Sequence, residues 1–137
     1  MSYPQLITAL KAGLVSAGLT ENPDPREDSL ANASRGAFDG SFLIVPESGA
    51  EPWPEAAKAT PSHWKGILRV EIATTLTTSV VSQSETVEQR ARLFFEKCVY
   101  GGLSAGEIYR WEPPTTSRNF KDKRIVWSIR LFVRWTE

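Results

Sequence analysis

Few side chains in this sequence have the types and spacing that catalysis requires. The 137 residues include one histidine, His63, and one cysteine, Cys98, so there is no histidine pair for a metal, no cysteine-based zinc set and no internal disulfide. Neither a P-loop nor a G-x-G-x-x-G motif occurs. Asp39 and Glu71 could act as an acid–base pair in a pocket, but no spacing places them together. The sequence therefore predicts a protein that is not an enzyme, with no catalytic, cofactor-binding or metal-binding residues.

The side chains best suited to binding are basic and lie towards the C-terminus. From Arg118 to Arg134 the chain carries six Lys and Arg residues against a single acid, Asp122. Trp53 is a second kind of candidate, because an indole held between two prolines is an apolar anchor that can dock on its own domain or on a neighbouring subunit. The predicted partner-binding residues are Trp53, Arg118, Lys121, Lys123, Arg130 and Arg134.

The charges are divided unevenly between the two halves of the chain. Residues 1–63 carry 4 Lys and Arg against 8 Asp and Glu, and residues 64–137 carry 12 against 8, so the halves have net charges of −4 and +4. A chain with zero net charge is a poor bulk binder of nucleic acid. Two halves of opposite net charge instead favour head-to-tail contact between copies of the chain, in which the acidic half of one copy meets the basic half of the next.

Length and composition indicate one ordinary globular domain over residues 1–137. The length supports a single core, and the hydrophobic content of 41% and charged content of 23% are average. No apolar run approaches the ~20 residues of a membrane span. The N-terminus has no basic segment followed by an apolar run, so we expect no signal peptide. Because a single cysteine forms no internal disulfide, the cytosol or an intracellular assembly is the expected setting.

The stretch from Arg124 to Trp135 predicts a long strand that organises the sheet. One alternating set is wholly apolar, and the other is mostly polar or charged. This period of two is typical of a strand with one buried face. The apolar set is Ile125, Trp127, Ile129, Leu131, Val133 and Trp135.

Apolar spacing also predicts the other elements. Residues 3–17 form a helical stripe that ends at Gly18, where positive φ is allowed and Leu19 folds back onto the stripe. The remaining predicted elements are strands at 38–45, 64–75 and 106–111, a helix at 85–99, and long polar connections at 46–63 and 112–123. Together they predict an α+β fold, with an antiparallel or mixed sheet of about four strands and two helices packed on one face.

The order of these elements resembles the tail terminator proteins of long-tailed, lambda-type bacteriophages. That family has an N-terminal helix, a short apolar strand, a long strand with charged alternation, a helix, and two closing strands joined by a polar loop. The corresponding segments here are residues 3–17, 42–45, 64–76, 85–99, 108–111 and 124–135. The resemblance covers nearly the whole chain and departs from the family in the longer 46–63 loop.

The resemblance implies a structural virion protein that is assembled in the host cytoplasm. Such proteins form a homo-hexameric ring that caps the tail tube, ends its polymerisation and joins the tail to the head. The implied partners are further copies of the chain, the major tail tube protein and the head–tail connector protein, with no membrane and no sequence-specific nucleic acid. Two alternatives stay open: another neck, head–tail joining or tail completion protein, and a cone-shaped α+β domain that binds or transforms a small molecule.

Overall fold

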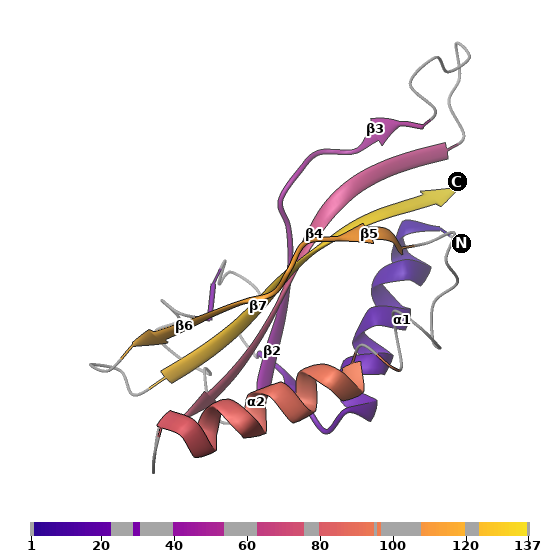
Figure 1. Ribbon diagram of the computed structural model, residues 1–137. Coiled ribbons are helices and arrows are strands. Elements are labelled where there is room, and N and C mark those ends of the chain that lie inside the picture. The colour runs from indigo at the N-terminus through magenta and orange to yellow at the C-terminus, as the bar shows by residue number, and fades with distance from the viewer. Residues whose placement is uncertain are drawn as a thin grey trace.

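The computed structural model describes residues 2–22, 29–30, 40–53, 63–75, 80–94, 96, 108–119 and 124–136. Within these residues the fold is α+β, with two helices and a mixed sheet of seven strands (Figure 1). The elements in chain order are α1 (Tyr3–Ser16), β1 (Thr20–Glu21), β2 (Ser41–Pro46), β3 (Glu51–Pro52), β4 (His63–Thr75), α2 (Val80–Phe94), β5 (Ile108–Trp111), β6 (Thr115–Asn119) and β7 (Arg124–Thr136).

Strands β4 and β7 form the centre of the sheet. Each has 13 residues, and they pair antiparallel along their whole length, from His63 opposite Thr136 to Thr75 opposite Arg124. The order across the sheet is β1-β2-β4-β7-β5, with β3 on β4 and β6 on β7. Only the β1–β2 pair is parallel among the described ladders.

The prediction of about four strands is wrong, because the described residues contain β1, β3 and β6 as well. β1 and β3 have two residues each, too few to show any alternation in the sequence. β6 lies inside the predicted 112–123 connection and pairs with the first half of β7. Its threonines and serine are exposed on both faces, so it lacks the apolar positions by which a strand is recognised.

The main core lies between the sheet and the two helices, which cover the same face (Figure 1). We call this the helix face and the opposite one the far face. The predicted apolar set of β7 is confirmed: Ile125, Trp127, Ile129, Leu131 and Val133 are all at most 1% exposed and belong to the helix-face core. They pack with apolar residues of β4 and of both helices.

Helix α1 begins and ends as its sequence predicts. Ser2 caps it by accepting a bond from the Gln5 backbone N–H, and the Gln5 side chain accepts from the Ser2 N–H in return. At the other end Gly18 has φ +86°. The Leu19 N–H donates to the Leu14 carbonyl at 3.2 Å, so Leu19 turns back into the core.

Helix α2 begins at Val80, earlier than the residue 85 that the sequence predicts. The predicted stripe is confirmed at Val87, Ala91 and Phe94, which are buried against the sheet. Cys98, which continues the same apolar spacing along the sequence, lies outside the described residues.

A second, smaller apolar cluster lies on the far face, which the alternation in β7 predicts to be mainly polar. It consists of Leu30, Leu43, Ala73 and Val126. Both backbone polar groups of Leu30 are hydrogen bonded to side chains. The Leu30 N–H donates to the Glu71 carboxylate at 3.2 Å, and the Leu30 carbonyl accepts from the Arg124 guanidinium at 3.2 Å. This part of the far face is therefore covered by a residue distant in the sequence.

Candidate functional site

The candidate site lies on the far face of the β4–β7 ladder. Residues directly opposite one another in a ladder project from the same face. Lys65, Ile67 and Arg69 of β4 therefore share the far face with their partners Arg134, Phe132 and Arg130 of β7. The even positions of β7 that the sequence assigned to a polar face thus converge with an equivalent row on β4.

Trp53 and Arg134, both predicted as partner-binding residues, are brought together on this face. The Trp53 N–H donates to the His63 carbonyl at 2.9 Å, which places the indole at the end of β3. The Arg134 guanidinium carbon lies 4.5 Å from the centre of the Trp53 ring and 5.6 Å from that of Tyr109. Trp53 therefore docks on its own domain in this structure, which was one of the two predicted possibilities.

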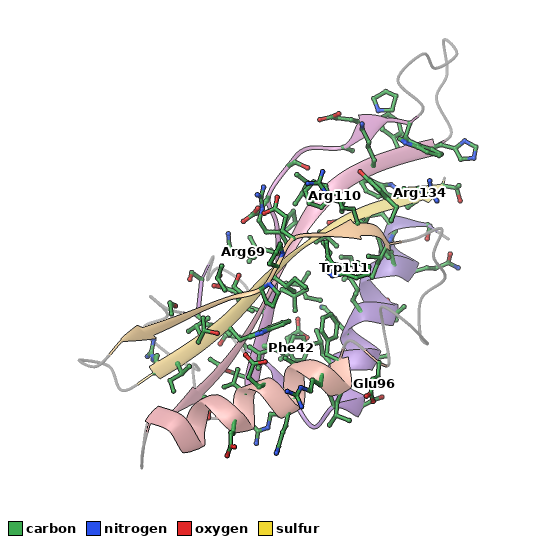
Figure 2. The ribbon with its side chains drawn as sticks, in the orientation of Figure 1. Phe42, Arg69, Glu96, Arg110, Trp111 and Arg134 are labelled. Atoms are coloured by element: carbon green, nitrogen blue, oxygen red, sulfur yellow. The ribbon has the colours of Figure 1, made fainter. Side chains whose placement is uncertain are left out.

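Strand β5 adds a second stacked arginine that the sequence prediction did not include. The Arg110 guanidinium carbon lies 4.8 Å from the centre of the Phe132 ring, and the Tyr109 ring meets Phe132 edge-on at 6.3 Å. Phe132 is an aromatic residue in the mostly polar set of β7. This departure from the pattern could have identified Phe132 as a site residue from the sequence. Figure 2 shows Arg110 and Arg134 towards the β3 end of the sheet, with Trp111 on the side of the helices.

We call this group the Arg–aromatic surface. Its members are Trp53, Tyr109, Arg110, Phe132 and Arg134. Stacking of a guanidinium on a ring contributes about 0.5–1 kcal/mol at exposed sites and restricts the motion of the side chain. The stacking therefore limits the positions that the Arg110 and Arg134 guanidinium groups occupy on this surface.

Arg130 lies further along β7 in an ion-pair network. Its Nε donates to Glu47 at 2.6 Å and its Nη1 to Glu112 at 3.1 Å. The Arg69 Nη1 donates to the other oxygen of Glu47 at 2.8 Å. The predicted partner role of Arg130 stays a prediction, and any partner would have to compete with these carboxylates.

The network also changes the acidity of Glu47. Burial raises the pKa of the Glu47 carboxyl, but hydrogen bonds from Arg69 and Arg130 outweigh this effect, so the pKa lies below its ordinary value. Glu47 belongs to the acidic half of the sequence and both arginines to the basic half. Part of the charge asymmetry is thus neutralised within one chain.

The remaining predicted residues are described only in part. Arg118 lies in β6, where its backbone is paired opposite Ile125, and its side chain lies outside the description. Lys121 and Lys123 lie outside the described residues altogether. The structure therefore brings together Trp53 and Arg134, places Arg130 further along the same face of β7, and leaves the other predicted residues untested.

A hollow of about 260 Å³ adjoins the Arg–aromatic surface. Its lining comes from the β3–β4 side and from β5 and β7: Ser48, Glu51, Lys65, Gly66, Ile67, Tyr109, Arg110 and Phe132. Lys65 and Glu51 form a loose ion pair at 3.9 Å. The hollow is smaller than the ~300–1,000 Å³ of typical ligand pockets, so it suits a single side chain better than a whole cofactor.

No arrangement for catalysis is apparent in the described part of the chain. No three metal-ligating side chains gather there. The segment Gly102 to Gly106 matches the G-x-S-x-G pattern of nucleophile elbows, but an elbow follows a strand and begins a helix. Here the segment follows α2 and precedes β5, which is the reverse order, and it lies outside the described residues.

Comparison with models of known protein families and with curated protein sequences gives no match. The resemblance drawn from the order of elements therefore stays a prediction. None of the helices in the described residues is long and apolar enough to cross a membrane.

Proposed function

We propose that the protein is a tail terminator of a long-tailed, lambda-type phage. In this proposal it is a virion protein, and its copies form a hexameric ring that caps the tail tube and joins the tail to the head connector. The observation that carries the proposal is the Arg–aromatic surface. Trp, Tyr and Arg are the residues enriched at the centres of protein interfaces, and here they gather on the face opposite the two described helices.

The two-sided architecture supports the same proposal. A closed head-to-tail ring requires every copy to present two unlike surfaces. Helices cover one face of this sheet, whereas arginines and aromatic rings line part of the other.

The alternative of a small-molecule domain requires a deep pocket with converging polar groups. The hollow that the described residues form beside Arg110, about 260 Å³, is smaller than such pockets usually are and does not support this alternative. Another neck or tail completion protein would use the same kind of surface as a terminator. The two are separated by the partner that the protein binds.

Light scattering of the purified protein over a range of concentration and salt tests this proposal. We expect six times the monomer mass, either for the protein alone or after addition of the major tail tube protein of the same phage. Arg134→Glu should abolish the ring, because it reverses a charge at the centre of the surface. Arg92→Glu, at an exposed position on α2, is the matched control.

A monomer or dimer whose mass does not change when the tube protein is added would refute the terminator proposal. A ring that binds the head connector but not the tube would instead identify a different neck protein. The unfolding midpoint of Arg134→Glu, measured by circular dichroism, must stay close to that of the wild-type protein. Only then can loss of the ring be attributed to the changed surface and not to unfolding.

A further inference from the structure

Three arginines of the far face differ in the partners that hold them. Arg69 and Arg130 are both bonded to Glu47. Arg110 is different: it stacks on Phe132, and no carboxylate of the described residues lies within ion-pair distance of it. A guanidinium that is stacked on a ring and has no acidic partner is well placed to receive a carboxylate from outside the chain.

The hollow beside Arg110 supplies the second half of a recognition site. Ile67, Phe132 and Tyr109 give it an apolar lining, and Lys65 and Arg110 give it positive charge. Glu51 is its only acidic lining residue among those described, and it is already 3.9 Å from Lys65. A volume of about 260 Å³ can take one large side chain. The complement of this site is therefore an apolar side chain flanked by negative charges.

We propose that the hollow at Arg110 docks an acidic segment of a different protein. One large apolar side chain of that segment enters the hollow, and neighbouring Asp or Glu carboxylates meet Arg110 and Lys65. Because Arg110 is already stacked on Phe132, little side-chain entropy is lost when the carboxylate binds.

We assign the occupant to a different protein because the carboxylates of this chain's described loops and short strands are already paired. These ion pairs are Glu21 with Lys11, Glu47 with Arg69, Glu51 with Lys65, and Glu112 with Arg130. A copy that donated one of them would break an existing pair. Glu85 and Glu88 of α2 and Glu96 after it are exposed, so a second copy is an outcome that the test must distinguish. The inference goes beyond the terminator proposal, since it needs no ring and names the chemistry of the partner.

Fluorescence anisotropy with a labelled peptide tests the inference. The probe is a short peptide of Asp and Glu residues around one central leucine. One companion peptide has serine in place of the leucine, and another has lysine in place of every acid. We expect only the first to bind well, and its affinity to fall as salt is raised, because partly exposed charges are screened.

Two variants locate the site. Arg110→Gln should weaken binding about threefold to tenfold, the loss expected for one partly exposed charge contact. Ile67→Phe should weaken it by filling the hollow with no change of charge. Arg92→Gln is the control, because it removes the same charge from an exposed position on the opposite side of the molecule. Thermal unfolding of each variant establishes that it is folded.

Four outcomes would overturn the inference, and a fifth would leave it standing. Equal weakening by Arg92→Gln would show attraction to overall charge, and equal binding of the serine peptide would show that the hollow is not used. Absence of binding at millimolar peptide refutes the site directly. If the wild-type protein self-associates, and both the peptide and Arg110→Gln abolish this, the occupant is a second copy. A protein that forms no ring yet binds the peptide at Arg110 would refute the terminator proposal alone.

Discussion

Leu30 provides a direct test of how the far face is held together. Its side chain is fully buried in the smaller cluster with Leu43, Ala73 and Val126. Its backbone N–H and carbonyl are bonded to the side chains of Glu71 and Arg124. Leu30→Ala keeps those backbone bonds and removes only the apolar packing, so it isolates one contribution.

The expected loss of stability follows from the size of the side chain. Truncation of leucine to alanine removes the equivalent of about three buried methylene groups, or roughly 2.4 kcal/mol at ~0.8 kcal/mol each. The cavity that remains adds to this, and buried Leu→Ala changes cost about 2–5 kcal/mol. The cluster is small and can partly collapse. We therefore expect the free energy of unfolding to fall by about 3 kcal/mol.

Urea unfolding, followed by tryptophan fluorescence, measures this change. Val15→Ala is the control, because Val15 is 59% exposed and its truncation should alter stability by less than about 0.5 kcal/mol. The dependence on urea should keep the same slope in all three proteins. A loss below about 0.5 kcal/mol for Leu30→Ala would refute the reasoning, since it would mean that the far-face cluster does not contribute to the fold.

Two further predictions follow from Gly40 and Glu47. Gly40 has φ +76°, a left-handed backbone conformation, so Gly40→Ala should lower stability by about 1–2 kcal/mol. The atom nearest to an added Cβ, the Arg90 Nη1 at 2.8 Å, is the end of a flexible side chain and adds little to this cost. Gly49→Ala, with open space around it, should not lower stability, and thermal unfolding compares the two variants. The pKa of the Glu47 carboxyl is lower in the folded protein than its ordinary value of 4.5. Ionised Glu47 therefore contributes its full stabilisation of the fold above pH 4.5, and this contribution is lost as the pH falls through the pKa of the folded state. Glu47→Gln should therefore be less stable than wild type at neutral pH, and the difference should shrink below pH 4.5 in urea unfolding; a difference independent of pH would contradict this.

The candidate site was predictable only in part. Trp53 and Arg134 are recognisable because each stands out from its local pattern, a tryptophan between prolines and an arginine in an alternating strand. Arg110 and Tyr109 are not recognisable in this way. They join the site because β5 pairs with β7 and a register shift occurs between Ile108 and Arg110, and neither feature is encoded in a short stretch of sequence.

The sequence by itself determined the elements whose pattern is long. The alternation of β7 specifies one buried face, and the apolar stripe of α1 with Gly18 after it specifies the inner side and the end of that helix. These features depend on residues close together in the chain, so local periodicity is sufficient to identify them.

Only the tertiary structure decided what each face of the sheet meets. Leu30 covers Val126, Glu47 binds Arg69 and Arg130, and the hollow forms where residues from β4, β5 and β7 converge. These contacts join positions far apart in the sequence, and their formation depends on strand order and register. The short strands β1 and β3 depend on the same information, because two residues become a strand only when a partner lies beside them.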